Sequence, residues 1–358
     1  MELALYDPDA GYYARAAQRS GRAGDFFTSV DVGPVFGELL EIQLAEMADL
    51  LAEVSTTLSA NVAPVDLVEA AAGNGRLAAD ILNAARRRDP AFYDRVRLHL
   101  VDASPAARAA QEQVLGPALE RLASSSADLP VSFEGALVAN ELLDAMPVHQ
   151  VVMRGDGLRE VYVDVLDGVL QTIDGPPSTP ELAAYLDRLG TPLEPGWRAE
   201  INLRAVEWIR AAARQLVRGF IIVIDYGHEA RELYSLMHAG GTLTTFARHT
   251  MAGPEQPAGA PAWLEDAGDR DITSHVDFTS VRMAAEAEGL TTLGFLDQTY
   301  FLIGLGAAGL DVSDLKRRLA LKTLLMPGGL GSTHKVLILG KGVGTPALAG
   351  CSYRMRVT

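Results

Sequence analysis

The stretch Val65–Leu77 decides the fold and reads Val-Asp-Leu-Val-Glu-Ala-Ala-Ala-Gly-Asn-Gly-Arg-Leu. Its first five residues form an apolar run that ends in an acid, and this run is short enough for a buried strand. The glycines of the turn that follows, Gly73 and Gly75, let the backbone approach a ligand closely. Apolar residues then recur at helical spacing from Arg76 to Ala85. The pattern predicts a strand, a ligand-binding turn and a helix, as in nucleotide-cofactor sites.

Glu69, the acid before the glycines, distinguishes this loop from a dinucleotide site. A carboxylate at this point suits a cofactor with a cationic amino-acid end and not a pyrophosphate, which favours S-adenosylmethionine. A plain strand-turn-helix connection produces the same local pattern, so the loop alone leaves both interpretations open. The third spaced glycine of the dinucleotide fingerprint is missing, which disfavours a nucleotide-dependent oxidoreductase.

A second acid ends the next predicted strand, Val96–Asp102. An open parallel sheet places such a carboxylate beside a ribose, so Asp102 and the adjacent Ala103 are predicted to bind the cofactor. The alternative is an acid that is simply solvated at a strand end. Ser104 is a candidate N-cap, with Pro105 in the first turn of the following helix.

The composition is that of a soluble globular protein, with 358 residues of which 48% are hydrophobic, enough for one large or two fused domains. The single Cys351 excludes an intrachain disulfide and fits a reducing compartment. Because no secretory signal is visible either, we expect a cytoplasmic protein. A net charge of −15 argues against nucleic-acid binding and permits a basic protein partner. The most membrane-like segment, Gly289–Leu310, carries Asp297 near its middle and is interpreted as a strand plus a buried helix, without membrane insertion.

Strand candidates alternate with helices along the chain, which predicts an α/β fold with a largely parallel sheet. They are Val65–Glu69, Val96–Asp102, Gly135–Asn140, Phe220–Asp225, Leu290–Phe295 and Lys335–Leu339. Strand-like runs separated by Gly/Asp turns predict a β-meander inserted into this core. These runs are Val148–Met153, Leu158–Leu166 and Val169–Ile173.

The expected organisation has an N-terminal lid and helical segment, a core in two parts, an inserted β-meander and helical subdomain, and a tail. The corresponding residues are 1–60, 61–146 with 199–342, 147–198 and 343–358. Residues 252–270 are rich in Gly, Pro and Ala and are predicted to form a loop or lid, and the tail is expected to be weakly ordered. Met1–Ala4 leads straight into Leu5-Tyr6-Asp7-Pro8, as if an N-terminal helix were missing from this chain.

Several separated motifs agree in order and combination with one family. They are Gly11-Tyr12-Tyr13, Gly24-Asp25-Phe26-Phe27-Thr28-Ser29, Asn140-Glu141-Leu142-Leu143-Asp144-Ala145-Met146-Pro147-Val148, Asp225-Tyr226-Gly227, Gly241-Thr242-Leu243 and Asp271-Ile272-Thr273-Ser274-His275-Val276-Asp277-Phe278. From about Leu5 to Gly340 the chain resembles the MidA-like family, which contains the mitochondrial complex I assembly-factor arginine methyltransferase and its bacterial relatives. The resemblance implies a Rossmann-like class I methyltransferase core that uses S-adenosylmethionine. In the mitochondrial branch, the target is an arginine of a complex I subunit.

Within this resemblance, Glu69, Gly73 and Gly75 match the cofactor loop of the family. Asp102 stands where the family usually has a longer acid, which alters the reach to the ribose. Ala71 is a departure, because the family normally has glycine there. If the site needs a positive φ at this position, the alanine weakens cofactor binding.

The Asn140–Pro147 motif follows an apolar strand and should lie at the carboxyl edge of the sheet, beside the transferable methyl group. A guanidinium is a planar fork of donors that stays protonated, so carboxylates are needed to hold it and aim one nitrogen. Glu141 and Asp144, three residues apart, can both face inward. Glu141, Asp144 and Asn140 are therefore the predicted catalytic residues, acting mainly by positioning and charge placement.

Other candidates have competing interpretations. The resemblance suggests that Asp25, Thr28 and Ser29 form a lid that binds the cofactor, whereas an N-cap and turn is an equally good alternative. Asp225 and Tyr226 end a core strand and are candidates for the substrate channel, with a structural role as the alternative for Tyr226.

The histidines complete the candidate residues. His275 is a further substrate-channel candidate, although a capping network with Asp277 at a helix entry is the preferred interpretation. His149 is expected to be structural. The seven histidines show no spacing typical of a metal-binding helix, so no metal site is predicted.

The sequence thus predicts a methyltransferase that transfers a methyl group from S-adenosylmethionine to a protein arginine, and the resemblance implies a respiratory complex I-type subunit as the target. Two rivals remain. One is an assembly chaperone that retains a cofactor-binding fold with weak or no turnover, and the other is the oxidoreductase.

Overall fold

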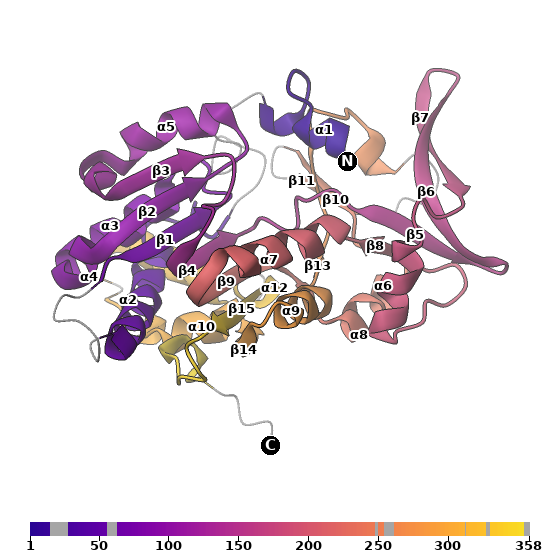
Figure 1. Ribbon diagram of the computed structural model, residues 1–358. Coiled ribbons are helices and arrows are strands. Elements are labelled where there is room, and N and C mark those ends of the chain that lie inside the picture. Colours follow the sequence, from indigo (N-terminus) through magenta and orange to yellow (C-terminus); the bar gives the residue numbers. More distant parts are fainter. Residues whose placement is uncertain are drawn as a thin grey trace.

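The computed structural model describes residues 1–14, 28–55, 63–247, 250–253, 261–311, 313–326 and 330–353. A central sheet crosses the molecule in the order β14-β15-β9-β4-β1-β2-β3 (Figure 1). The strands in this order are β1 Val65–Ala70, β2 Val96–Val101, β3 Leu122–Ser126, β4 Phe133–Asn140, β9 Leu216–His228, β14 Thr291–Asp297 and β15 His334–Lys341. An eighth strand, β13 Val276–Asp277, pairs with the end of β9 outside this order. Strands β3, β2, β1, β4 and β9 pair in parallel, and β15 runs antiparallel to both of its neighbours. The predicted α/β fold with a largely parallel sheet is confirmed.

Side chains of the central strands point alternately into two hydrophobic clusters, one on each face of the sheet. In β9, Phe220 and Ile222 join one cluster, while Ile221 and Val223 join the other. This alternation follows from the two-residue period of a strand, and it explains why the strands read as continuous apolar runs. Both faces are therefore buried, which leaves the strand ends as the place for a site.

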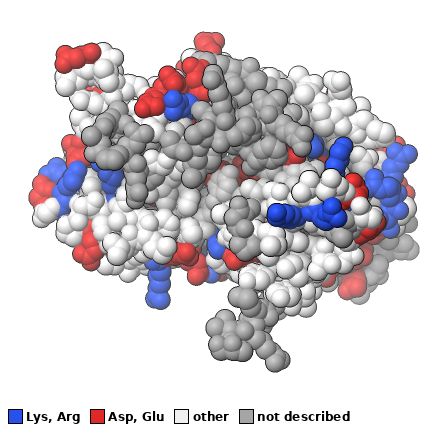
Figure 2. Space-filling model, turned by 180° about the vertical axis from the view of Figure 1, so that it is seen from behind, with Lys and Arg blue, Asp and Glu red and all other residues white. Residues whose placement is uncertain are grey.

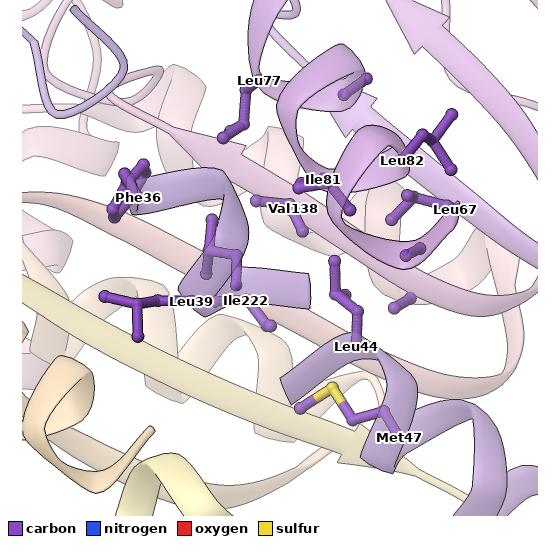
Figure 3. Close-up of a cluster of buried hydrophobic side chains, with 14 of the residues drawn as sticks. Phe36, Leu39, Leu44, Met47, Leu67, Leu77, Ile81, Leu82, Val138 and Ile222 are labelled. Carbon is purple, nitrogen blue, oxygen red and sulfur yellow. The ribbon is translucent and has the colours of Figure 1, made fainter. Parts of the chain in front are cut away.

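Helices cover both faces of the sheet. α2 (Val35–Ser55) and α3 (Arg76–Arg88) pack on one face, and α7 (Leu203–Gln215) and α9 (Phe278–Ala287) pack on the other. Figure 3 shows side chains of α2 and α3 meeting those of β1, β4 and β9. The remaining helices are α1 Glu2–Tyr6, α4 Pro90–Arg95, α5 Pro105–Leu115, α6 Glu181–Leu189, α8 Ala230–Leu233, α10 Gln298–Gly304, α11 Leu315–Leu325 and α12 Leu330–Thr333.

α2 lies within the region predicted as an N-terminal lid and helical segment. Phe36, Leu39 and Leu40 of this helix are fully buried in the core, so the helical part of this region packs against the central sheet. Figure 1 shows α1 above the carboxyl ends of the central strands, beside β10.

Two smaller sheets accompany the central one. The first has the antiparallel order β7-β6-β5-β8, built from β5 His149–Arg154, β6 Gly157–Leu166, β7 Val169–Gly175 and β8 Arg198–Ile201. Its first three strands match the predicted meander, whereas β8 was not predicted. The second sheet joins β10 (Thr244–Ala247) to β11 (Thr250–Ala252) and β12 (Asp271–Thr273). The described part of the predicted 252–270 loop includes the 3-10 turn η4, Ala262–Leu264.

The chain after β15 is better ordered than expected, as far as Tyr353. Leu348 is buried in the core, and the backbone N–H of Gly350 donates to Gln43 Oε1 at 2.9 Å. The Ala349 N–H donates to Glu46 Oε2 at 3.0 Å. Polar side chains of α2 thus bind this backbone, a long-range contact that composition does not reveal.

The segment predicted as a strand plus a buried helix forms β14 and α10. Among the described residues, no helix is both long and apolar enough to cross a membrane. On the face shown in Figure 2, basic side chains are interspersed with acidic ones.

Candidate active site

The turn after β1 carries the backbone features of a ligand loop. Ala71, Gly73 and Gly75 all have left-handed backbone, with φ of +57°, +51° and +83°. A Cβ on Gly75 would lie 3.1 Å from Leu100 Cδ1, so close packing as well as φ requires glycine there. At Gly73, no atom lies within 4 Å of the position of a Cβ. The turn is therefore held on its protein side and open on the other, which fits a bound ligand.

Glu69 lies buried at the end of β1, and its carboxylate accepts a hydrogen bond from the backbone N–H of Ala78 at 3.0 Å. Burial raises the pKa of Glu69 to about 8, against the effect of this hydrogen bond, and the charge of Asp102 acts in the same direction as burial. A cationic group beside this carboxylate would restore its ionised form. The Glu69 carboxylate, as a hydrogen-bond acceptor, therefore fits the ammonium end of S-adenosylmethionine.

Asp102 joins the turns that follow β1 and β2. Its Oδ2 accepts from the Gly73 N–H and its Oδ1 from the Ser104 N–H, both at 2.8 Å. Ser104 in turn caps α5, because its Oγ accepts from the Ala107 N–H at 3.3 Å, as predicted. Ala103 is exposed between them. Contacts of Asp102 and Ala103 with a ribose stay predictions.

Glu141 follows β4 in a left-handed conformation, with φ of +51°. This conformation is unfavourable for a residue with a side chain, and such strain concentrates at functional sites. The carboxylate Oε1 accepts from the Ser29 N–H at 3.1 Å and from Asn140 Nδ2 at 3.2 Å. Oε2 accepts from the Tyr226 hydroxyl at 3.3 Å. The side chain is thus held in one orientation at the carboxyl edge of the sheet.

Asp225 shapes the backbone of the same motif. It is fully buried, and its Oδ2 accepts from the N–H groups of Leu142, Leu143 and Asp144 at 3.1, 2.8 and 3.3 Å. Its Oδ1 accepts from the Tyr226 N–H at 2.9 Å. Burial raises the pKa of Asp225 to about 7. Asp225 therefore positions the Glu141–Asp144 turn from behind, and its place in a substrate channel stays a prediction.

Two acceptor oxygens of the motif have no hydrogen-bond partner within the part of the chain that the structure describes. They are Asn140 Oδ1 and Asp144 Oδ1, both buried. Burial raises the pKa of Asp144 well above its usual range, and the charges of Asp225 and Glu141 act in the same direction. Unpartnered buried acceptors are costly in isolation, so this arrangement is suited to an incoming donor.

The structure adds residues that sequence reasoning missed. Tyr13 donates from its hydroxyl to Asp271 Oδ1 at 2.8 Å, and the charge of Asp271 contributes to the raised pKa of Asp144. The Tyr6 hydroxyl donates to the Ala145 carbonyl at 2.9 Å. The buried His334 Nε2 lies 3.6 Å from Glu141 Oε1. The Gly-Tyr-Tyr motif was a signal for Tyr13, whereas no sequence pattern pointed to His334.

The two lid candidates within the described residues, Thr28 and Ser29, have different contacts. Ser29 is buried, and it contacts Glu141 through its N–H. Thr28 donates from its N–H and hydroxyl to Asp31 within its own turn, and Asp31 lies 3.7 Å from Arg76 at the start of α3. Asp25 lies outside the described residues. Cofactor contacts of these three residues stay predictions.

Asp277 caps α9, because its Oδ1 accepts from the N–H groups of Thr279 and Ser280 at 2.9 and 3.2 Å. The preferred capping interpretation of this segment is confirmed for Asp277. His149 pairs with Glu160 Oε1 at 2.7 Å in the inserted subdomain, in line with a structural role.

His275 has a different environment, since its ring lies beside those of His228 and His238. The expectation of no metal site rested on spacing along the chain, and spacing does not reveal this cluster.

Comparisons with known proteins agree with this geometry. Residues 17–296 match a family model described as "Putative S-adenosyl-L-methionine-dependent methyltransferase". A crystal structure from Burkholderia thailandensis, bound to S-adenosyl-homocysteine, superposes with a TM-score of 0.84 at 31% identity and covers 99% of this chain and 90% of that one. The mitochondrial protein arginine methyltransferase NDUFAF7 of Mus musculus is 27% identical, over 95% of this chain and 75% of its own. Its Drosophila melanogaster homologue is 28% identical, over 84% and 69%.

Proposed function

Because the chain belongs to this family of S-adenosylmethionine-dependent methyltransferases, we propose that its substrate is an arginine side chain of a protein. The observation that carries the proposal is the oriented Glu141 carboxylate flanked by the unpartnered oxygens of Asn140 and Asp144. Two relatives whose names state protein arginine methylation support it.

The chemistry of this edge fits a guanidinium better than other methyl acceptors. A guanidinium offers five N–H donors in one plane, and it keeps its charge at neutral pH. Glu141, Asn140 and Asp144 together offer acceptor oxygens on one short turn. An arriving cation also favours the ionised form of Asp144, which burial otherwise disfavours. A neutral small-molecule acceptor would leave these carboxylates uncompensated.

Bound S-adenosylmethionine supplies a methyl group activated on a sulfonium sulfur. In this proposal Glu69 holds the ammonium end, and Asp102 fixes the turn that carries Gly73. Glu141 aims one guanidinium nitrogen at the methyl group. As the N–C bond forms and the C–S bond breaks, that nitrogen gives up a proton, which the Glu141 carboxylate accepts. Positioning and charge placement then supply most of the rate acceleration.

The partner follows from charge and family. A net charge of −15 suits a basic segment around the target arginine. We take a respiratory complex I-type subunit as the first candidate, because the resemblance points there, and a cytoplasmic location remains part of this proposal.

Mass spectrometry of a candidate subunit tests the proposal, after incubation with isotope-labelled cofactor. We expect the wild type to label arginine. Glu141→Gln should lose this label and Glu288→Gln should keep it. Glu288 is a matched control because it forms an exposed ion pair with Arg214. Label only on lysine or on a small molecule would overturn the substrate assignment.

A second candidate function is the assembly chaperone with weak or no turnover. The left-handed backbone at Ala71 favours it, because strain in the cofactor turn can weaken binding. S-adenosylhomocysteine binding without methyl transfer to any candidate subunit would support this alternative.

A further inference from the structure

His228, His238 and His275 form a cluster, which we call the three-histidine cluster. His228 ends β9, His238 ends the 3-10 turn η3 (Leu236–His238), and His275 lies in the turn between β12 and β13 (Val276–Asp277). One ring nitrogen of each histidine lies within 4.8 Å of the other two. The ring centroids are 4.8 to 5.7 Å apart. Three different segments thus direct imidazole nitrogens to one place.

The surroundings orient one of these rings as in known metal sites. His238 Nδ1 lies 3.1 Å from the Glu232 carbonyl oxygen. Because a carbonyl can only accept, Nδ1 carries the proton and Nε2 keeps a lone pair for a ligand bond. The Glu232 carboxylate lies 3.0 Å from His228 Nδ1, but this contact lacks hydrogen-bond geometry, so His228 Nδ1 is buried without a hydrogen-bond partner among the described residues. Backbone carbonyls and carboxylates are the usual partners of the second nitrogen of a metal-bound histidine.

The third ring has an unexplained polar atom. His275 Nδ1 is buried and has no hydrogen-bond partner among the described residues. The backbone N–H of His275 donates to Thr242 Oγ1 at 3.1 Å, which fixes the position of its turn. A buried imidazole nitrogen without a partner, on a ring that packs against two other imidazoles, is better explained by a shared ligand than by ring packing alone.

We propose that the three-histidine cluster binds one divalent transition-metal ion, of which Zn²⁺ is the best match. Imidazole is a preferred ligand of zinc, and three histidines leave a fourth position for water. In a tetrahedral zinc site, ligand nitrogens lie about 3.4 Å apart, so modest ring rotations complete the geometry. All three rings are partly exposed, which provides an entry path.

This site would connect to the substrate motif through the backbone. The residue before His275 is Ser274, whose N–H donates to the Asp144 carbonyl at 3.0 Å. His228 follows Asp225 by three residues on the same strand. A bound ion would therefore tie together β9, η3 and the β12–β13 turn, and so stiffen the support of Asp144. Its role in this proposal is structural, outside the methyl-transfer step.

The full-length chain, without an affinity tag and stripped with a chelator, should bind one Zn²⁺ per chain in calorimetry. Co²⁺ should give the visible absorption of a low-coordinate histidine site. His238→Ala should abolish both signals, because it removes a ligand from a surface turn. His149→Ala is the matched control and should retain both, since His149 pairs with Glu160 elsewhere.

Melting temperature provides a second measurement. Zn²⁺ should raise it for the wild type and for His149→Ala, but not for His238→Ala or His275→Asn. Absence of stoichiometric binding in the wild type, or equal binding by His238→Ala and wild type, would overturn the site. S-adenosylhomocysteine binding, measured on each variant, shows that the variant is folded. Failure of the metal site is thereby distinguished from failure of the proposed methyl transfer.

Discussion

The turns after β1 and β4 share one backbone feature and differ in how their polar groups are satisfied. Ala71 follows β1 and Glu141 follows β4, and both adopt left-handed backbone, with φ of +57° and +51°. At the first turn, Asp102 uses both carboxylate oxygens to hold backbone N–H groups. At the second turn, acceptor oxygens of Asn140 and Asp144 have no partner within the described residues. The first turn, proposed to bind the cofactor, is preformed, whereas the second, proposed to bind the substrate, has acceptors available for a donor.

Because the two turns differ in this way, the same left-handed backbone strain is expected to have different consequences at Ala71 and at Glu141. A left-handed conformation costs an L-residue about 1–2 kcal/mol. At Glu141 the strain orients a carboxylate that accepts hydrogen bonds from Ser29, Asn140 and Tyr226. At Ala71 it orients only an exposed methyl group. Backbone strain that orients a polar side chain, as at Glu141, is expected to be functional. Backbone strain that orients only a methyl group, as at Ala71, is expected to be dispensable.

The largest effect should come from neutralising the substrate turn. Glu141→Gln and Asp144→Asn keep the approximate shape but remove a carboxylate that would hold the guanidinium. Arginine methylation should fall by about a hundredfold or more in each, because charge placement in the transition state is lost. Labelled methyl transfer measures this, and calorimetry should show that Asp144→Asn keeps its cofactor affinity. Undiminished methylation by both variants would remove these residues from the site.

Glu141→Gly tests whether the carboxylate of Glu141 serves methyl transfer or the stability of the fold. Glycine tolerates positive φ, so this variant should be at least as stable as the wild type while transfer is lost. Thermal unfolding and the transfer assay together measure the two outcomes. A strongly destabilised Glu141→Gly would mean that the carboxylate holds the fold and not the substrate.

Substitution of Glu69, next to the turn after β1, should lower the affinity for the cofactor. Glu69→Ala removes a charged contact with the cofactor ammonium, a loss of about 1.5–3 kcal/mol, or roughly ten- to a hundredfold in affinity. Calorimetry with S-adenosylhomocysteine measures it. Because Glu69 also accepts from the Ala78 N–H, Glu69→Gln is the control that keeps an acceptor there. Equal affinity of wild type and both variants would exclude Glu69 from the cofactor site.

The strands of both turns were predictable, because their apolar runs are bounded by turn residues. β3 was missed, since Leu-Ala-Ser-Ser-Ser is polar and the strand lies at a sheet edge. The proximity of Glu141 and Asp144 follows from their spacing. The support by Asp225 does not, because it depends on the pairing of Asn140 with Ile224 in the neighbouring strand.

Contacts between segments that are distant in the sequence also could not be predicted elsewhere in the site. Tyr13 and Asp271 are 258 residues apart. The three-histidine cluster likewise draws on separate turns that no local period connects. Local pattern thus predicts the strands and the motif, while tertiary packing alone determines which polar groups meet there.

The raised pKa of Glu69 predicts that cofactor affinity depends on pH. With a pKa of about 8 in the free protein, Glu69 is largely protonated below that pH. Binding an ammonium group then requires loss of this proton, so cofactor affinity should fall as the pH falls from 8. The expected decrease is at most about tenfold per pH unit. Calorimetry across this range should show a flat response in Glu69→Gln. A wild-type affinity independent of pH would contradict the ammonium contact.

The smallest effect should come from Ala71→Gly. Relief of the left-handed alanine, about 1–2 kcal/mol, is partly offset by the larger unfolded-state entropy of glycine, about 0.4–1 kcal/mol. The net expectation is a gain of up to about 1.6 kcal/mol in unfolding free energy, with cofactor affinity equal or slightly higher. Denaturant titration measures the gain, and Ala184→Gly on the exposed face of α6 is the matched control, which should lose about 0.5–1 kcal/mol. Equal destabilisation by both substitutions would show that Ala71 is unstrained, and the parallel between the two turns would then rest on Glu141 alone.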